Sequence, residues 1–258
     1  MLDLIGIAGA VLFLYMTCIW FIAQRIHDLS IVDIAWGGGF VLLSWIGLGY
    51  VSEPTTRQII LTILVTIWGL RLSGYIYIRG RGKEEDYRYQ DMRKRWGDRV
   101  ALISFVRVYM FQGVILFLLS FPLFIVYTMD NGSSLGWLDY LGITLWLIGF
   151  GFEAISDQQL YRFKQNPNNK GKVIQSGLWK YTRHPNYFGE SLLWWGIFML
   201  ALAVPYGIAT VYAPIALTFL LLKVSGVPLL EKKYMQKPEF REYAKRTNQF
   251  IPWFPKKK

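Results

Sequence analysis

The chain has 258 residues, hydrophobic residues make up 53% of it, and its mean hydropathy is +0.30. A water-soluble domain is rarely so apolar, so the composition argues against a soluble globular protein. The net charge of +11 would suit nucleic acid, but the basic residues gather in the connections between apolar segments, where anionic lipid headgroups are the expected partner. With one cysteine and two histidines, we expect neither a disulfide framework nor a metal site.

Seven apolar runs are long enough to cross the roughly 30 Å hydrocarbon core of a bilayer. They cover approximately residues 4–23, 30–51, 57–78, 105–129, 135–156, 186–204 and 206–226. The sequence therefore predicts an all-α fold, a polytopic membrane protein with about seven transmembrane helices.

The basic residues also predict an orientation, because loops rich in Lys and Arg stay in the cytoplasm. If the N-terminus lies outside, every basic residue except Arg57 and Arg71 falls in a segment on the cytoplasmic side. We therefore expect the N-terminus outside and the C-terminus in the cytoplasm.

Two ionisable residues fall inside predicted spans, Asp33 in the second and Arg71 in the third. Charges inside a membrane are costly and usually face the interior of the helix bundle. Two hypotheses follow: a buried ion pair that stabilises helix packing, or a catalytic role. The run of glycines at 37–39, one turn later, is expected to let a neighbouring helix approach closely rather than to bind phosphate.

The connection from 79 to 97 mixes charged and aromatic residues. This pattern is typical of a solvated loop with a short helix at the membrane interface. A lid over a pocket that opens to the cytoplasm is the alternative.

The densest polar pattern begins at the cytoplasmic end of the fifth predicted helix. Four polar residues recur there at intervals of four, four and three, so they share one helix face. They are Glu153, Asp157, Tyr161 and Lys164. Apolar residues border the first two, and we therefore expect them near the membrane boundary rather than on a fully solvated helix end.

Pro185 suits the first turn of the next helix, where its missing N–H costs nothing. The free N–H groups and the positive dipole end of that helix would point to the cytoplasmic face. Basic groups gather beside it, namely Lys164, Lys172, Arg183 and His184. Together these groups predict an anion site suited to a phosphate or pyrophosphate.

Asn186 and Glu190 lie one turn apart on the same helix and offer an amide and a carboxylate to a ribose or a nicotinamide-type amide. In the alternative, His-Pro-Asn only caps the helix and Glu190 pairs with a lysine. The chain carries neither a Gly-rich dinucleotide motif after a strand nor a P-loop, so the helices themselves would hold any nucleotide.

After the last predicted span, residues 228–252 alternate aromatic and charged side chains. A membrane-surface amphipathic helix is one interpretation. The other is a segment that closes the pocket, with Glu231 and Tyr234 emerging beside the anion site.

Four segments and the closing Phe-Ile-Pro carry a family resemblance. The four are Trp-Gly-Leu-Arg-Leu at 68–72, Glu-Asp-Tyr-Arg-Tyr at 85–89, Ser-Asp-Gln-Gln-Leu-Tyr-Arg-Phe-Lys at 156–164, and Gly-Leu-Trp-Lys-Tyr-Thr-Arg-His-Pro-Asn-Tyr-Phe-Gly-Glu at 177–190. With them the chain resembles the bacterial membrane proteins of the steroid 5-alpha-reductase-like superfamily. The resemblance covers nearly the whole chain and is most specific in its C-terminal half.

The resemblance implies a seven-helix fold that holds NADPH and reduces a carbon–carbon double bond in a steroid-like or other enone lipid, as a 3-oxo-5-alpha-steroid 4-dehydrogenase does. It divides a single integral membrane domain, 1–258, into substrate-side helices at approximately 1–129 and a cofactor-binding part at approximately 150–258. The positions that fall on the cofactor-binding motifs are Asp157, Lys164, Lys172, Arg183, Asn186, Tyr187 and Glu190, with Glu231 and Tyr234 matching less closely. Glu153, Tyr181 and His184, in or beside the same segments, complete the candidate set.

The catalytic Gln-Glu pair of the steroid reductases has no counterpart in this sequence. The nearest ionisable group of the second span is Asp33, and Tyr75 or Tyr77 in the third could supply the phenol. These three residues are therefore the candidates for polarising the carbonyl as negative charge develops on it.

Two other functional classes stay open. The chain also resembles isoprenylcysteine and phospholipid methyltransferases at residues 183–185, at Tyr187 and Gly189 and in the segment 231–252, which would make the cofactor S-adenosylmethionine. The segment 156–159 and Glu190 favour the reductase. A lipid-binding or transport protein without enzymatic activity is the third hypothesis.

The expected partners are a lipid or steroid-like substrate and the membrane itself. The bacterial branch of the resemblance implies the bacterial inner membrane, and an organelle membrane is the alternative.

Overall fold

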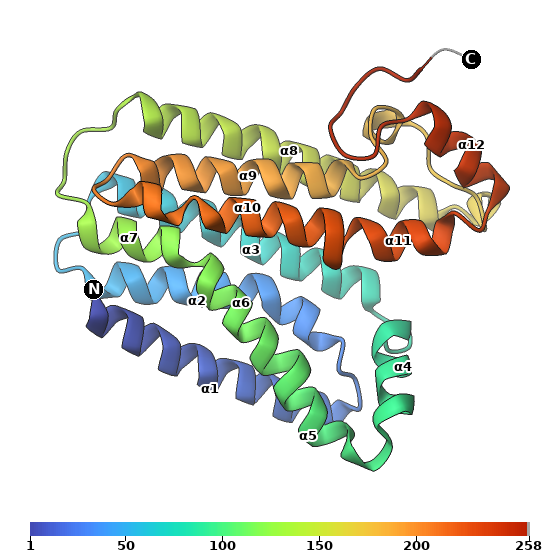
Figure 1. The fold of residues 1–258 in the computed structure, drawn as a ribbon, viewed down its shortest axis with the longest axis horizontal. Helices are drawn as coiled ribbons and strands as arrows, with labels where there is room; N and C mark the ends of the chain where they lie inside the picture. Colours follow the sequence, from blue (N-terminus) through green and yellow to red (C-terminus); the bar gives the residue numbers. More distant parts are fainter. Residues whose placement is uncertain (257–258) are drawn as a thin grey trace. The chain divides into compact units, whose positions relative to one another are not determined.

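The computed structural model describes residues 1–256, which form helices and no β-strand (Figure 1). The α-helices are α1 (Leu2–Ile26), α2 (Ile31–Tyr50), α3 (Thr56–Gly80), α4 (Tyr87–Trp96), α5 (Val100–Ser104), α6 (Phe111–Leu119), α7 (Phe121–Met129), α8 (Trp137–Gln165), α9 (Pro185–Leu202), α10 (Tyr212–Phe219), α11 (Val227–Tyr234) and α12 (Pro238–Arg246). Two π-helical segments, η2 (Phe105–Met110) and η6 (Leu220–Val224), continue α5 into α6 and α10 toward α11. Short 3₁₀ turns lie at Gly97–Arg99, Pro167–Asn169, Gly177–Lys180 and Gly207–Thr210.

Six helices of the described chain are long and apolar enough to cross a membrane. They are Leu2–Ile26, Ile31–Tyr50, Thr56–Gly80, Tyr87–Leu119, Trp137–Gln165 and Gly207–Tyr234. This confirms the predicted all-α membrane fold, and the chain is a multi-pass membrane protein. The predicted span 186–204 forms α9, which is 18 residues long and is not among the six. Asn186 and Glu190 in its first turns make it less apolar than the other helices.

The chain forms two compact units. Unit 1 comprises Met1–Leu135 together with Val204–Thr210, and unit 2 comprises Gly136–Ala203 and the chain from Val211 onward. The segment 150–258, predicted to bind the cofactor, belongs to unit 2 except for residues 204–210.

Glycines bring α2 and α3 of unit 1 into backbone contact. A methyl group added at Gly69 would lie 2.6 Å from the carbonyl oxygen of Gly37, and one added at Gly39 would lie 2.5 Å from a methyl carbon of Leu116 on α6. Lipid gives helices no hydrophobic reason to associate, so close van der Waals packing at small residues takes over that role. The predicted function of the 37–39 glycines is thereby confirmed.

A buried polar network joins the start of α3 to the end of α7. Thr55 and Gln58 form a reciprocal capping box at the α3 N-terminus, and the Gln58 amide donates to the carbonyl oxygens of Val126 and Tyr127 at 3.1 and 3.3 Å. Arg57 forms an ion pair with Asp130 although both side chains are at most 2% exposed. The network therefore gives hydrogen-bond partners both to backbone N–H groups at the start of α3 and to backbone carbonyl groups at the end of α7.

We predict that Arg57→Met destabilises the protein by about 3–5 kcal/mol, because it leaves the carboxylate of Asp130 buried without its charge partner. Thermal or SDS-induced unfolding of the purified protein measures the effect. Arg99→Met is the control, since Arg99 is exposed, and should change stability by less than about 0.5 kcal/mol. Equal stability of the two variants would contradict the role given to the ion pair.

In unit 2, α8 and α9 pack backbone to backbone along their length. A methyl group at Gly149 would lie 2.6 Å from the carbonyl oxygen of Gly189, and one at Gly142 would lie 2.7 Å from that of Gly196. The helices thus meet at two glycine pairs, seven residues apart on each helix. Only glycine fits at these points, and the side chains on either side of them are held in a fixed register.

A pair of glycines on α8 tests this packing. We predict that Gly149→Ala destabilises unit 2 by about 1–3 kcal/mol through overpacking. Gly151→Ala, two residues away, adds a methyl group with nothing within 4 Å and should stabilise the helix by up to about 1 kcal/mol. Unfolding of both variants in the same detergent gives the comparison. If only the Gly151→Ala variant lost stability, the contact with α9 would lie at Gly151 and not at Gly149.

Candidate functional site

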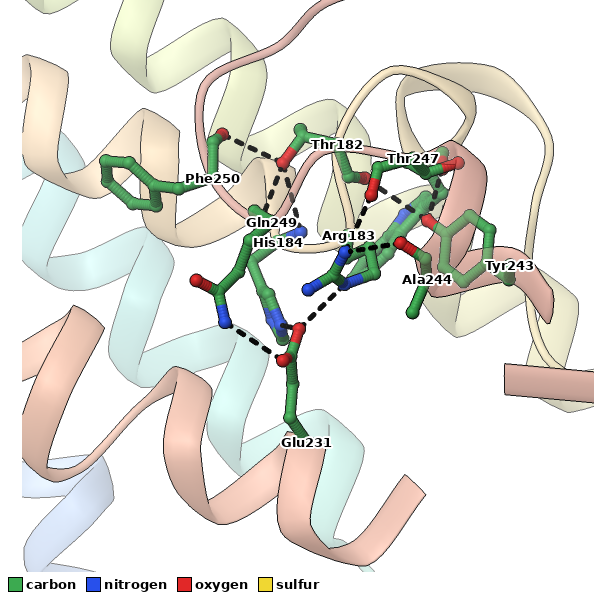
Figure 2. A network of polar contacts seen from close by, with 10 residues as sticks. Thr182, Arg183, His184, Glu231, Tyr243, Ala244, Thr247, Gln249 and Phe250 are labelled. Carbon is green, nitrogen blue, oxygen red and sulfur yellow. Dashed lines mark hydrogen bonds and ion pairs between the residues drawn. The ribbon is translucent and has the colours of Figure 1, made fainter. Parts of the chain in front are cut away.

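The start of α9 is the centre of a polar cluster in unit 2, shown in Figure 2. Pro185 occupies the first turn of α9, as predicted, and His184 is the N-cap residue. The cluster also draws on Thr182 and Arg183 before the helix, Glu231 on α11, Tyr243 on α12 and residues 247–250. It unites three of the predicted cofactor-binding residues, Arg183, His184 and Glu231.

The guanidinium of Arg183 donates three hydrogen bonds within this cluster. Its Nε donates to Glu231 Oε1 at 2.7 Å, and one terminal nitrogen donates to the carbonyl oxygens of Ala244 and Thr247 at 3.1 and 2.7 Å. Arg183 is 9% exposed. The rigid fork of an arginine suits such a three-way contact, so in this structure Arg183 holds the C-terminal segment.

Glu231 accepts hydrogen bonds from three different side chains. Arg183 and His184 Nε2 reach Oε1, the latter at 3.1 Å, and the Gln249 amide donates to Oε2 at 2.9 Å. A buried carboxylate with several donors and a positive partner is stably ionised. Glu231 is thus the point where α9, α11 and the C-terminal segment are joined.

Thr182 fixes the C-terminal segment along the residues that precede α9. It forms a parallel bridge with Asn248, and its hydroxyl donates to the carbonyl oxygens of Gln249 and Phe250 at 3.2 and 2.8 Å. The hydroxyl of Tyr243 donates to the carbonyl oxygen of Trp179. Burial raises the pKa of this phenol, which keeps it protonated as a donor.

Carboxylates of α8 lie beside the first turn of α9. Glu153 and Asp157 are 2% and 4% exposed, and the amide nitrogen of Asn186 donates to Asp157 Oδ1 at 3.3 Å. The glycine contact at Gly149 and Gly189 brings the two helices to this distance, since a methyl group at Gly189 would lie 2.5 Å from the backbone nitrogen of Glu153. The structure therefore brings together two of the predicted cofactor-binding residues, Asp157 and Asn186.

The remaining predicted cofactor-binding residues are less enclosed. Lys164 and Lys172 are exposed, whereas Tyr181, Tyr187, Glu190 and Tyr234 are half-buried. The ring of Tyr187 stacks on His184 with centroids 5.7 Å apart. Tyr234 stacks on Phe240 of α12 and thus packs against the C-terminal helix.

The sequence analysis did not predict that the helix before Glu231 is interrupted. The π-helical segment η6 ends at Val224, and Gly226 is the N-cap residue of α11, which has Pro228 in its first turn. A methyl group at Gly226 would lie 3.1 Å from the ring of Tyr187. The Ser-Gly-x-Pro pattern at 225–228 is the signal that marks this interruption.

In unit 1, Asp33 lies at the centre of a second polar cluster. Arg88 and Tyr89, both on α4, donate to its two carboxylate oxygens at 2.7 Å each. Arg88 also donates to Asp86, the N-cap residue of α4. Burial alone would raise the pKa of Asp86, but hydrogen bonds from the Arg88 side chain and backbone N–H lower the pKa below its ordinary value.

The phenol that contacts Asp33 is therefore that of Tyr89. Tyr75 lies between Arg71 and Arg79, whose guanidinium carbons are 5.9 and 5.4 Å from its ring centroid, and Tyr77 is 54% exposed. Tyr89 was missed as a candidate although it closes the Glu-Asp-Tyr-Arg-Tyr motif. Helix α4, which confirms the short helix predicted within 79–97, carries Tyr89 back onto the start of α2.

The fold and this cluster thus define a class: a helical multi-pass membrane protein with a polar cluster at one end of its C-terminal helices. The chain belongs to the family described as "Protein of unknown function (DUF1295)", whose model matches residues 19–247. It is also similar to an uncharacterized protein, C594.04c, of Schizosaccharomyces pombe, with 27% identity over 80% of this chain and 66% of that relative. No solved structure matches the chain significantly.

We predict that Arg183→Lys, which keeps the charge but not the fork, frees the segment 244–250. Loss of the bonds to Ala244 and Thr247 should speed amide hydrogen exchange there by about tenfold or more, because each such bond contributes about 1–3 kcal/mol. Exchange of α1 amides, in the other unit, serves as the internal reference. Unchanged protection of 244–250 would show that Arg183 does not hold this segment.

Proposed function

We propose that the chain is a membrane-embedded, NADPH-dependent reductase of a carbon–carbon double bond in an enone lipid, and that it works in the bacterial inner membrane. One observation carries the proposal. Buried carboxylates on α8 lie beside Asn186 on the first turn of α9, in the segments whose motifs resemble the cofactor-binding motifs of steroid 5-alpha-reductases. The multi-pass fold also suits a substrate that arrives from the bilayer.

The residues at the start of α9 fit a nicotinamide nucleotide. Among residues 1–256, Asn186 Oδ1 is buried without a hydrogen-bond partner, so it is ready to accept from the amide of a nicotinamide. Glu190 lies one turn later on α9, and its carboxylate is proposed to bind the same nicotinamide end of the cofactor. The side chains of Lys164 and Lys172 are exposed and are the positive groups proposed to meet the phosphates, whereas the guanidinium of Arg183 donates to Glu231 and to two carbonyls.

The chemistry divides between the cofactor and the chain. NADPH, when bound, supplies a hydride to the β-carbon of the enone, and a proton taken up at the α-carbon completes the saturated carbonyl compound. The chain binds the carbonyl oxygen with a hydrogen-bond donor, which stabilises the negative charge that develops there. Asp33, Tyr75 and Tyr77 are the predicted groups for this task. Tyr89 donates its one hydroxyl hydrogen to Asp33 and thus holds that carboxylate in place.

The test is titration of the purified protein with NADPH, followed by calorimetry and cofactor fluorescence. Asn186→Leu should weaken NADPH binding by about tenfold, because a buried amide of the cofactor loses its acceptor. Asn168→Leu is the matched control, since Asn168 is an exposed asparagine of the same unit. Glu190→Gln should lower NADPH oxidation with a 3-oxo-4-ene steroid as the probe enone.

The same titration with S-adenosylmethionine separates the reductase from a methyltransferase. Heat released by S-adenosylmethionine and not by NADPH would overturn the proposal in favour of methyl transfer. If neither cofactor bound, the remaining hypothesis would be a lipid-binding or transport protein without enzymatic activity. NADPH oxidation unaffected by Glu190→Gln would remove Glu190 from the site.

A further inference from the structure

Residues 248–256, called here the C-terminal strap, expose three large apolar side chains on unit 2. Ile251, Trp253 and Phe254 are 65%, 67% and 74% exposed. Single exposed apolar side chains are common on protein surfaces, but three within four residues form a patch, and such a patch marks a contact with a partner or a membrane. The strap therefore needs an occupant for this patch.

Backbone hydrogen bonds hold the strap in place. The N–H of Trp253 donates to the carbonyl oxygen of Tyr181 at 3.0 Å, and that of Lys256 donates to the carbonyl oxygen of Arg246 at 2.9 Å. The hydroxyl of Thr182 donates to two carbonyl oxygens at the start of the strap. The apolar side chains thus stay exposed on a fixed backbone.

The strap lies level with one boundary of the hydrocarbon layer. Helix α8, one of the six candidate spans, begins at Trp137, which is 73% exposed and is typical of a membrane interface. Ser156 follows 19 residues later, a rise of about 28 Å, close to the roughly 30 Å of the hydrocarbon core. The carbonyl oxygen of Ser156 accepts from Trp179 Nε1 at 3.1 Å. Residues 179–181, and the strap bonded to Tyr181, therefore lie at the second boundary.

Helix α12 uses its own apolar face within the protein. Phe240 stacks on Tyr234 of α11, and the hydroxyl of Tyr243 donates to the carbonyl oxygen of Trp179. The other face of α12 is charged and exposed, with Glu239, Arg241, Glu242 and Lys245. The strap, and not α12, therefore presents apolar side chains to the surroundings.

Lysines accompany the aromatic side chains of the strap. Lys180 Nζ lies 5.8 Å from the ring centroid of Tyr181, and the rings of Tyr181 and Phe254 have centroids 5.9 Å apart. Trp253 contacts Phe254 in turn, and Lys256 is exposed two residues later. The strap contains no acidic residue. Aromatic rings beside lysines suit the region where acyl chains meet anionic headgroups.

We propose that the C-terminal strap is a membrane-interface anchor that recognises anionic phospholipid. Trp253 and Phe254 insert where acyl chains meet headgroups, and Lys180 and Lys256 contact the negative headgroups. The proposal stands on depth, exposure and charge and is independent of the proposed reductase activity. Gln249 of the strap donates to Glu231, so lipid bound to the strap also stabilises the polar cluster at the start of α9.

A nitroxide label measures the depth of the strap. The chain has one cysteine, so Trp253→Cys in a Cys18→Ala background carries a single label, and Lys245→Cys on the exposed face of α12 is the matched control. In nanodiscs of phosphatidylcholine and phosphatidylglycerol, the label at 253 should collide more with oxygen, which dissolves among acyl chains, than with a water-soluble nickel chelate. The label at 245 should show the reverse order.

Two outcomes of this measurement would overturn the anchor. Preference for the chelate at both positions would place the strap in water. A label at 253 that neither reagent reaches would show that protein covers the patch, as in contact with a second copy of the chain.

Hydrogen exchange of the unlabelled protein tests the recognition of charge. Amides of 248–254 should exchange about fivefold or more slowly when phosphatidylglycerol is added to phosphatidylcholine nanodiscs, the factor expected for one lysine near an anionic surface. Lys180→Gln combined with Lys256→Gln should abolish this difference. Arg241→Gln combined with Lys245→Gln removes the same charge from α12 and should preserve it. No lipid effect in the unaltered protein, or its equal loss in both double variants, would refute recognition of anionic lipid by the strap.

Discussion

The contact between the backbones of α8 and α9 determines how the polar residues of unit 2 lie. Within lipid, helices associate through close packing rather than through the hydrophobic effect, and the glycines at 142, 149, 189 and 196 allow a separation that no other residue permits. Glu153 and Asp157 of α8 then lie within reach of the first turn of α9. A wider separation would take from buried Asp157 the hydrogen bond donated by Asn186, and the loss of a donor is costly to a buried carboxylate.

The second constraint is charge balance at the start of α9. Arg183 and Glu231 form a buried pair that joins three separate stretches of chain, and such a pair fixes a geometry more than it adds stability. Beside this pair, Nδ1 of His184 and the amide oxygen of Asn186 are buried without a hydrogen-bond partner among the residues that the structure describes.

Much of the fold could be read from the sequence, because the length of an apolar run follows directly from the thickness of a bilayer. The close packing at the glycines of α2 and the position of Pro185 at the start of α9 could be predicted for similarly local reasons. The partners of Arg183 and Asp33 were not. Arg183 meets Glu231, Ala244 and Thr247, which lie 48 to 64 residues away, and Asp33 meets Tyr89 across 56 residues. Local periodicity carries no information about such contacts, and hydropathy does not show the interruption of the helix at Gly226, shortly before Glu231.

The distance in sequence between Arg183 and its partners has a consequence for biosynthesis. Helices enter the membrane in order during translation, so Arg183 and His184 are in place before α11 and the segment 244–250 have been made. Until then the guanidinium lacks the carboxylate and carbonyls that later surround it, and the cluster is completed only by the last part of the described chain. A nascent or truncated chain would thus display an uncompensated arginine at the membrane boundary, a feature by which quality-control proteases could distinguish it from the finished protein.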